Sequence, residues 1–387
     1  MMRQALCGAT IFDGEARTRH EALLIENGVV AGIAGPGQIP PDYTVVTLDG
    51  GLLTAGFVDI QVNGGGGVML NDQTDSVAME RIARAHRRFG TTTLLPTLIT
   101  DTPERTTQAI SAAQAAVSDG IAGVGGLHLE GPHLSLARRG AHDPSLIRPM
   151  TDGDLEILMA AAQSLPSLYL TVAPESVSNA QIQALCAAGA IVSLGHSDCD
   201  AETARAAFDA GATAATHLFN AMSQLGNREP GLVGAVLEDG RVWSAFIADG
   251  IHVAPTSLSV ALRGKKGPAR LFLVTDAMST IGTDIKQFEL NGREIRRENG
   301  RLTLANGTLA GADLDMISAV RFAATTLGLG VDEALRMAAL YPAQMLGRRD
   351  LGALCKGAQA DVLWLDEADL TIRAIWQNGR RVAAEDS

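Results

Sequence analysis

Four residues whose side chains bind metals or carry protons stand where short apolar runs end. One carboxylate and two imidazoles suit a zinc-like divalent ion with an open position for water, and a further carboxylate can serve as a base. Any one of them alone would more readily be a packed residue, or a helix N-cap in the case of Asp276. Four run ends together favour a hydrolytic metal site. They are Glu130 in LHLEGPH, His196 in SLGHSD, His217 in ATHLFN and Asp276 in LVTDAM.

The expected chemistry is hydrolysis by an activated water. A bound divalent ion lowers the pKa of its water to about 7, so that hydroxide is available at neutral pH. We predict that Asp276 accepts the proton of this water and passes it to the leaving nitrogen of an amide. Expulsion of an amine needs this protonation as much as the carbonyl needs attack.

The fold must bring these residues together, and the chain supplies eight apolar runs that are typical of strands. They alternate with Ala-rich segments that carry charges at helical spacing, a pattern that indicates repeated βα units. The predicted helices include 76–89, 104–118, 152–163 and 202–210. The predicted strands are 53–62, 91–97, 124–130, 168–175, 191–197, 214–220, 242–251 and 271–276.

Eight alternating units predict a (β/α)₈ barrel of the TIM type. An open doubly wound sheet would carry GxGxxG near its first turn, and the glycine run 64–67 does not have that spacing. In a barrel the C-terminal ends of the strands converge on one mouth. Residues far apart in the sequence therefore become neighbours there.

The two ends of the chain differ from its middle, because they show short strand-like runs and glycine turns with few helical stretches. We predict a small β-sandwich built from both termini, residues 1–50 and 348–387, beside a barrel of residues 51–347. A polar insertion near 285–306 contains Asn291-Gly292 and Asn299-Gly300, which indicate hairpins on the active face of the barrel.

Composition narrows the functional class. A chain of 387 residues with 46% hydrophobic content can bury a large core, and its net charge of -12 argues against general binding to nucleic acids or anionic lipids. No apolar run reaches the ~18 residues of a membrane span. The four cysteines form no CxxC pair. We therefore predict a soluble, cytoplasmic protein without disulfides.

Eight motifs extend these inferences: GFVDIQVNGGGG, LHLEGPHLSLARRGAHDP, GHSD, GATAATHLFNAM, REPG, ADGIHV, LVTDAM and NGTLAG. Over nearly the whole chain they resemble the N-acetylglucosamine-6-phosphate deacetylase family of the amidohydrolase superfamily. The resemblance implies a barrel with a β-sandwich from both termini and a homodimer. It also implies hydrolysis of N-acetyl-D-glucosamine 6-phosphate to D-glucosamine 6-phosphate and acetate, in amino-sugar breakdown or cell-wall recycling.

The resemblance also implies roles for individual residues, and it agrees with the ligands and the base named above. It implies that Arg228 reaches the sugar phosphate in the partner subunit, where a guanidinium could make a bidentate contact. His142 and His252 are expected to meet the sugar hydroxyls or the acetyl oxygen. The full set of implied substrate contacts is Ala141, His142, Asn220, Ala221, Arg228, Asp249, Gly250, Ile251, His252, Leu309, Ala310 and Gly311.

One departure bears on the number of metals. Many amidohydrolases carry His-x-His at the end of the first barrel strand, where this chain has Gln61 and Asn63. Amides are poor ligands beside imidazole. We predict one tightly held divalent ion, with Gln61 and Asn63 holding water or a weak second ion. Zinc is the first choice, and iron, cobalt or manganese suit the same ligands.

Three residues close in sequence to the predicted ligands could also be taken for parts of the metal site. Strand alternation turns His128 to the side of Glu130, and we predict a supporting or packing role for it. His133 lies beyond a Gly-Pro break and is expected to approach the mouth. Cys199 follows His196 by three residues, but cysteines are often simply buried, so we leave it out of the ligand set.

Two alternative functions stay open. Another amidohydrolase, such as an N-acetylgalactosamine-6-phosphate deacetylase or a cyclic-imide hydrolase, would use the same barrel. The HLEGP and REPG motifs favour the amino-sugar branch, and the missing His-x-His argues against dihydroorotases and dihydropyrimidinases. A non-catalytic scaffold of this superfamily should lack a ligand or the base, whereas all four residues are present here.

Overall fold

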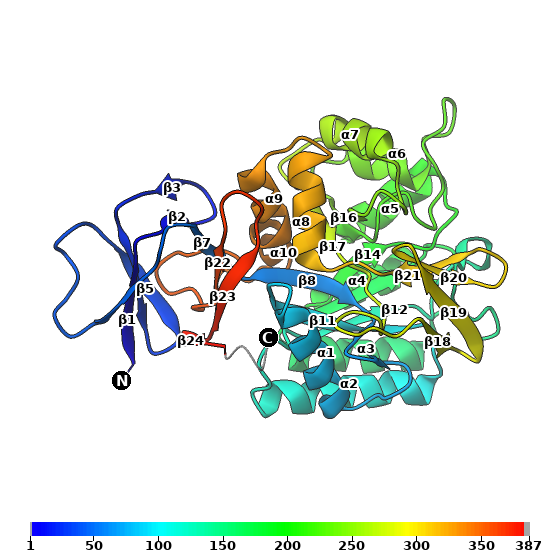
Figure 1. Cartoon of the computed structure of the whole chain (residues 1–387). Helices are drawn as coiled ribbons and strands as arrows, with labels where there is room; N and C mark the ends of the chain where they lie inside the picture. Colours follow the sequence, from blue (N-terminus) through cyan, green and yellow to red (C-terminus); the bar gives the residue numbers. More distant parts are fainter. Residues whose placement is uncertain (1, 383–387) are drawn as a thin grey trace.

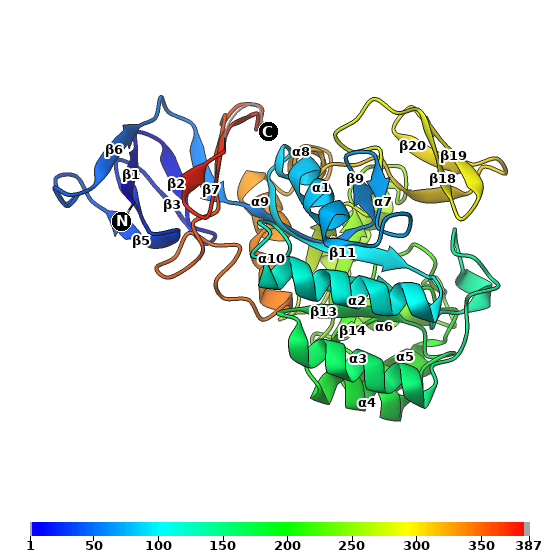
Figure 2. The same ribbon diagram turned by 90° about the horizontal axis from the view of Figure 1, so that it is seen from below.

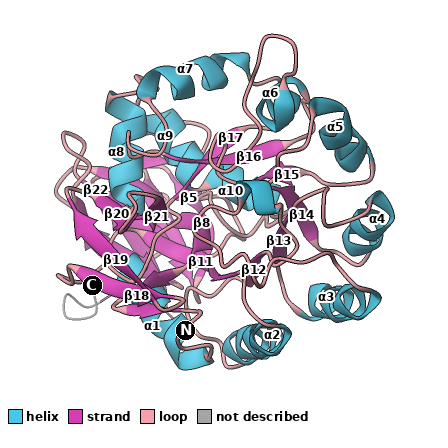
Figure 3. Cartoon of the chain, turned by 90° about the vertical axis from the view of Figure 1, so that its right-hand side faces the viewer, coloured by secondary structure: helices cyan, strands magenta, loops and turns pink. Residues whose placement is uncertain are grey.

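Eight parallel strands form the centre of the computed structural model, which describes residues 2–382 (Figures 1 and 3). Their order in the sheet follows their order in the chain, and helices surround them, which is the predicted TIM-type barrel. Seven of the eight strands lie at the predicted positions; six of them start later or end earlier than predicted, and β11 extends two residues further, to Ile99. They are β8 (Phe57–Val62), β11 (Thr91–Ile99), β12 (Leu127–Glu130), β13 (Leu168–Val172), β14 (Ile191–Leu194), β15 (Ala214–Ala215), β16 (Trp243–Ile247) and β17 (Leu271–Val274).

The barrel closes between its last strand and its first. The Asp276 N–H donates to Gln61 O at 3.0 Å, and the Asn63 N–H donates to Ala277 O at 2.9 Å. Inside the barrel the Thr275 hydroxyl donates to the fully buried carboxylate of Asp59 at 2.5 Å. Two strands that are distant in the sequence are thus joined where the predicted base lies.

Ten helices are described, and those between the strands cover the outside of the barrel (Figures 2 and 3). Most start at a side-chain cap, as the Asp, Ser and Thr residues at their N-termini favour. Thr151 and Ser178 form full capping boxes. The helices are α1 (Ser76–Arg87), α2 (Pro103–Ser118), α3 (Asp152–Ser164), α4 (Asn179–Ala187), α5 (Ala201–Asp209), α6 (Gly231–Glu238), α7 (Pro255–Gly264), α8 (Met316–Thr325), α9 (Val331–Ala338) and α10 (Leu340–Met345). In the described part of the chain, none of them is both long and apolar enough to cross a bilayer.

Two mixed sheets from both ends of the chain lie at one end of the barrel, at the left of Figure 1. The six-stranded sheet interleaves the termini in the order β24-β23-β22-β7-β2-β3, and the other has the order β5-β4-β1-β6. Residues 1 and 383–387 of the predicted sandwich lie outside the described residues. The strands are β1 (Arg3–Cys7), β2 (Thr10–Phe12), β3 (Arg17–Thr18), β4 (Ala22–Glu26), β5 (Val29–Ala34), β6 (Thr44–Thr47), β7 (Leu52–Ala55), β22 (Val362–Leu365), β23 (Ile372–Gln377) and β24 (Arg380–Arg381).

The predicted first barrel strand, 53–62, is in fact two strands. β7 belongs to the six-stranded terminal sheet, and only β8 enters the barrel. Gly56 separates them, and a Cβ at this position would lie 2.1 Å from Thr92 Oγ1, so the chain passes its neighbour too closely for a larger residue. The terminal sheet therefore reaches Ala55 along the chain.

A four-stranded antiparallel sheet, which we call the hairpin module (287–312), lies at the opposite end of the barrel, at the right of Figure 1. Asn291, Gly292, Asn299 and Gly300 all have positive φ, the conformation that tight hairpin turns require. The module packs on Met69 of β10 (Val68–Met69), which forms a short two-stranded sheet with β9 (Gly64–Gly65). Its strands are β18 (Gln287–Leu290), β19 (Arg293–Glu298), β20 (Arg301–Leu304) and β21 (Leu309–Ala312).

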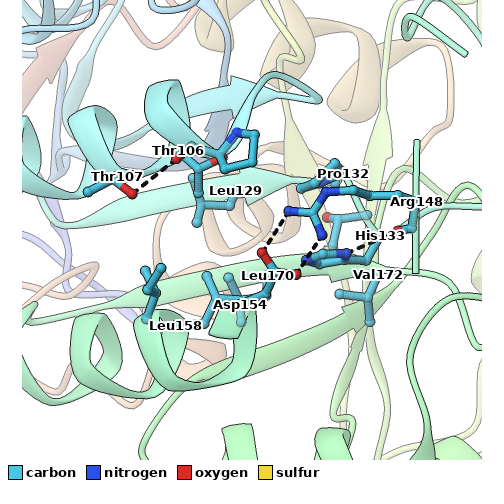
Figure 4. Close-up of a pocket in the computed structure, with 14 residues that line it drawn as sticks. Thr106, Thr107, Leu129, Pro132, His133, Arg148, Asp154, Leu158, Leu170 and Val172 are labelled. Atoms are coloured by element: carbon cyan, nitrogen blue, oxygen red, sulfur yellow. Dashed lines mark hydrogen bonds and ion pairs between the residues drawn. The ribbon is translucent and has the colours of Figure 1, made fainter. Parts of the chain in front are cut away.

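An ion pair supports the start of α3 on the outside of the barrel (Figure 4). The Arg148 guanidinium donates to both carboxylate oxygens of Asp154, at 2.5 and 2.6 Å, while Asp154 also accepts the N–H of Thr151 as part of the capping box. The hydrogen bonds from Arg148 hold the pKa of the Asp154 carboxyl below its ordinary value. The charged form of Asp154 therefore stabilises the fold.

The Asp154→Asn variant should lose about 1–2 kcal/mol of unfolding free energy at neutral pH, because a charged pair becomes a neutral one. A depressed carboxyl pKa stabilises fully above the unfolded value of about 3.9 and loses its effect as the pH falls below it. Urea denaturation of both proteins should therefore show a gap at pH 7 that narrows toward about pH 3. Equal stabilities at pH 7 would contradict the assignment.

Candidate metal centre

Three donor atoms from distant parts of the chain meet at the mouth of the barrel. Glu130 Oε1 lies 3.1 Å from His196 Nε2 and 3.1 Å from His217 Nε2, and the two imidazole nitrogens are 3.1 Å apart. All three side chains are buried. This spacing lets three atoms reach one zinc-like ion at about 2.0–2.2 Å. The structure thus brings together the three predicted ligands.

The backbone at these positions is unusual. Glu130 is the last residue of β12, while His196, His217 and Asp276 each follow the last residue of their strand by two positions. These three have φ values of 48°, 30° and 52°, in the left-handed region that residues with a Cβ seldom adopt. Such strain persists where the surrounding structure holds it, and it gathers at functional sites.

The orientation of His196 suits a metal ligand. Its Nδ1–H donates to Arg138 O at 2.8 Å, in the loop that carries a short 3₁₀ helix (Leu136–Arg138). Metal-binding histidines commonly fix the other ring nitrogen in this way. His196 thereby presents Nε2 to Glu130 Oε1 and His217 Nε2, and Nε2 is the atom available to a metal ion. His217 Nδ1 has no hydrogen-bond partner among the described residues.

The electrostatics of Glu130 and His217 also favour a metal site formed by these three residues. Burial raises the pKa of Glu130, but the hydrogen bonds of His196 and His217 outweigh it, and the net pKa lies well below the ordinary value. Burial lowers the pKa of His217, but the carboxylate of Glu130 outweighs it, and the net pKa is raised. The buried carboxylate of Glu130 therefore favours positive charge on the neighbouring His217, as it would favour a bound cation.

Glu130, His142 and His196 form a second set of donors, within 4.8 Å of one another. His142 is held differently from His196, because its Nδ1 accepts the Thr100 N–H at 3.3 Å and lies 2.7 Å from the Thr100 hydroxyl. Burial lowers its pKa to about 3, so the ring is neutral and carries its proton on Nε2. A protonated Nε2 is a hydrogen-bond donor, and His217 is the better third ligand.

Asp276 lies beside this cluster with one oxygen anchored. Its Oδ1 accepts the amide of Asn63 at 2.7 Å and that of Gln61 at 3.2 Å, and Gln61 also donates to Glu130 at 3.2 Å. No donor from the described residues reaches Oδ2. Burial, followed by the negative charge of Glu130, raises the pKa of Asp276 to about 6. A carboxylate held in this way can exchange a proton near neutral pH.

A cavity of about 260 Å³ opens above these residues. The hairpin module forms part of its wall through Leu290 of β18, Leu309 of β21 and Thr308 just before β21. None of the lining residues is a lysine or an arginine. The lining comprises Asn63, Ile99, Glu130, Gly140, Ala141, His142, His196, His217, Asn220, Ala221, Ile247, His252, Asp276, Met278, Leu290, Thr308, Leu309 and Gly311.

Six of these lining residues were not among the sequence predictions. Ile99 and Ile247 are the last residues of β11 and β16, so the rule that strand ends meet at the mouth would have found them. Gly140, Met278, Leu290 and Thr308 enter the wall through loop and module packing, for which the sequence gives no comparable signal.

Other predicted contacts lie beside the cavity rather than in its wall. Asp249 Oδ2 accepts the Nδ1–H of His252 at 2.6 Å, so Asp249 orients that ring. Gly250 and Ile251 complete the same turn, in which the Ile251 N–H also donates to Asp249. Ala310 is fully buried in the hairpin module. Arg228 is exposed on the loop between β15 and α6.

The expectation that His133 approaches the mouth is wrong. His133 lies in a cleft on the outside of the barrel, between α2 and α3, where its Nδ1 contacts Arg148 O at 3.1 Å (Figure 4). The Gly-Pro break turns the chain away from the mouth after Glu130. The cleft has a volume of about 20 Å³, which is enough for one water molecule and too little for a substrate.

Comparison with known proteins gives a consistent picture. A model of the amidohydrolase family matches residues 52–382. The chain is 43% identical to an N-acetylgalactosamine-6-phosphate deacetylase of Shewanella sp. (strain ANA-3) over 374 residues, which cover 96% of this chain and 94% of the relative. It is 35% identical to an N-acetylglucosamine-6-phosphate deacetylase of Haemophilus influenzae over 376 residues, covering 93% and 94%. The crystal structure of N-acetylglucosamine-6-phosphate deacetylase from Pasteurella multocida matches with a TM-score of 0.94 and 32% identity, covering 99% of this chain and 100% of that one.

Proposed function

Because this chain belongs to the amidohydrolase family, we propose that it is a metal-dependent enzyme that hydrolyses the acetamide of N-acetyl-D-glucosamine 6-phosphate to D-glucosamine 6-phosphate and acetate. Similar proteins carry this activity in their names. One observation of the chain supports it most strongly. Three metal-binding donors lie 3.1 Å apart, next to a buried carboxylate that has one oxygen free.

In this proposal Glu130, His196 and His217 hold one divalent ion, with zinc as the first choice. When bound, the ion supplies a water with a lowered pKa and polarises the acetyl carbonyl. The donor set of one carboxylate and two imidazoles fits such an ion. Gln61 and Asn63 have buried amide oxygens without a partner, which suit a water or a weak second ion.

Asp276 is the proposed acid and base. Its Oδ2 takes the proton of the attacking water while the amides of Gln61 and Asn63 hold Oδ1 in place. The protonated carboxyl then donates to the amide nitrogen as the bond to the acetyl carbon breaks. A pKa of about 6 suits both steps, since the group can accept and release a proton near neutral pH.

Two histidines bind the substrate in this proposal. His142 presents Nε2–H toward the ligand cluster, with its ring 4.4 Å from that of His196, and donates to the acetyl oxygen as charge develops there. His252 is held by Asp249 through Nδ1, which leaves Nε2 to meet a sugar hydroxyl. The two imidazole rings therefore bind different groups of the substrate, the acetyl oxygen and a sugar hydroxyl.

The phosphate needs a cation that the cavity wall of one chain does not provide. Arg228 is exposed and has no acidic partner among the described residues, so it is free to reach another molecule. We propose a homodimer in which each Arg228 binds the phosphate in the partner's cavity. This arrangement reconciles an acidic protein with an anionic substrate.

The Arg228→Ala variant should raise KM for the phosphorylated substrate by about 10–100-fold, because a charge-assisted contact is worth about 1.5–3 kcal/mol. Its rate on unphosphorylated N-acetylglucosamine should not change. Arg263→Ala, at an exposed arginine on α7, is the matched control and should leave both rates intact. Equal losses on both substrates would refute the phosphate assignment, and sedimentation would test the dimer directly.

A second candidate substrate is N-acetyl-D-galactosamine 6-phosphate, because the relative that is 43% identical carries that name. Acetate release from the two epimers, each with metal supplied, decides between them through kcat/KM. A higher value for the glucosamine epimer supports the first proposal, and a higher value for the other replaces it. Inactivity on both, together with little bound metal, would indicate a non-catalytic scaffold.

The proposed location is the cytoplasm. All four cysteines are unpaired, which suits a reducing compartment. Amino-sugar breakdown or cell-wall recycling is the corresponding physiological role.

A further inference from the structure

A continuous chain of buried polar side chains crosses the barrel directly beneath the proposed ligands. Tyr169 donates to Ser193 at 2.7 Å, Ser193 lies 2.7 Å from Thr216, and Thr216 lies 2.7 Å from Thr171. Thr171 is in turn 2.8 Å from His128 Nε2. All five residues are at most 1% exposed. The neighbouring strands β12, β13 and β14 and the residue that follows β15 are thus joined side chain to side chain.

This series of hydrogen-bonded side chains ends at Thr97 on β11. The hydroxyl of Thr97 lies 3.2 Å from His128 Nδ1 and 3.2 Å from Leu95 O, and it accepts the Val62 N–H at 2.9 Å. The Leu95 carbonyl can accept a proton but cannot donate one. Thr97 is therefore the donor at this end, and this direction of donation determines which group donates in each of the other hydrogen bonds.

One direction gives every hydrogen an acceptor and ends on a carbonyl oxygen. Each hydroxyl from Tyr169 to Thr171 can donate to the next, ending at His128 Nε2, while His128 Nδ1–H donates to Thr97 and Thr97 donates to Leu95 O. In the opposite direction the hydroxyls of Tyr169, Ser193 and Thr216 would have to donate to one another in a closed ring, because no other acceptor among the described residues ends the series. The first direction uses only contacts of 2.7–3.2 Å, so it is the favoured one.

We infer that His128 is a positioning residue, held as its Nδ1–H tautomer, that fixes the strand ends carrying Glu130 and His217. His128 lies two residues before Glu130 on the same side of β12, and its ring meets Tyr169 edge to face at 4.8 Å. Thr216 directly precedes His217, whose left-handed backbone needs support from its surroundings. The inference rests on the proposed metal site.

The tautomer gives a first test that needs neither metal nor activity. The protein contains eight histidines, and labelling them with ¹⁵N allows the bare and protonated ring nitrogens to be distinguished by two-dimensional NMR of the metal-free protein. The signals that vanish in His128→Asn identify the residue. A proton on Nδ1 supports the inference, and a proton on Nε2 overturns it.

The second test measures metal binding in a graded series. His128→Phe and Thr171→Val break the middle of the chain and should weaken metal affinity about 10–100-fold, as losses in the outer shell of a metal site do. Tyr169→Phe removes only the first donor and should stay within about twofold of wild type. Thr171→Val keeps the side-chain shape, so it remains informative if His128→Phe does not fold.

The outcomes separate this inference from the proposed function. Unchanged affinity in both central variants overturns the positioning role even if wild type deacetylates its substrate. A wild type that binds no divalent ion overturns both the role and the metal site. Conversely, the expected series of affinities would support the role even if the substrate proved to be a different amide.

Discussion

The Asp276→Asn variant should hydrolyse the proposed substrate about 10²–10⁴ times more slowly than wild type, the usual effect of removing a general acid or base. Asparagine keeps the shape of the side chain, but it cannot take the proton of the water or return one to the leaving nitrogen. The loss should appear in kcat, measured as acetate released at saturating substrate with metal supplied. Metal content should match that of wild type, because Asp276 is outside the proposed ligand set.

The dependence of the hydrolysis rate on pH is a second measurement that tests the role of Asp276. Burial and the charge of Glu130 raise the pKa of Asp276 to about 6, and the attacking step needs its ionised form. The wild-type rate should therefore rise with pH through about 6, whereas the residual rate of Asp276→Asn should lack that rise. Asp154→Asn is the matched control, because it makes the same chemical change on the outside of the barrel. Its kcat and pH profile should equal those of wild type.

Removal of the metal should lower activity by about 10³-fold or more, because the water would return to a pKa far above neutral. Dialysis against a chelator, followed by the addition of zinc, iron, cobalt or manganese, tests both the requirement and the preferred ion. Activity should return with at least one of them. Full activity after the ion has been removed and its absence confirmed would exclude a metal-dependent mechanism.

Metal binding should also depend on pH in a defined direction. The raised pKa of His217 means that this ring keeps its proton to a higher pH than a free imidazole does, and the proton must leave before the nitrogen can bind an ion. Affinity should therefore weaken as the pH falls through that raised value. Calorimetry in two buffers with different ionisation enthalpies measures the proton released. In Glu130→Gln, which lacks the carboxylate, both the affinity and the release should decrease.

Much of the barrel could be predicted from the sequence, because its signals are local. Apolar runs and helical charge spacing mark the βα units. The rule that strand ends converge predicts that Glu130, His196, His217 and Asp276 lie together, as they do in the structure. The hairpin turns were predictable for a similar reason, since Asn-Gly favours positive φ at both residues.

Other features depend on contacts that no local pattern records. The division of β7 from β8 at Gly56 follows from the close approach of Thr92, a residue that is distant in the sequence. The wall formed by Leu290 and Thr308 depends on how the hairpin module docks. The choice between His142 and His217 as third ligand needs the tautomer that the Thr100 N–H imposes, which only the folded geometry shows.

The six-stranded terminal sheet has a consequence for biosynthesis. β7 pairs with β2 on one edge and with β22 on the other, and β22 is translated only after the whole barrel. While the ribosome is still making the C-terminal segment, the nascent chain presents β7 with one edge open. An unpaired edge is a template for association with other chains. The nascent chain should therefore depend on chaperones most strongly until translation ends. Truncation before Val362 should yield aggregates rather than a smaller enzyme.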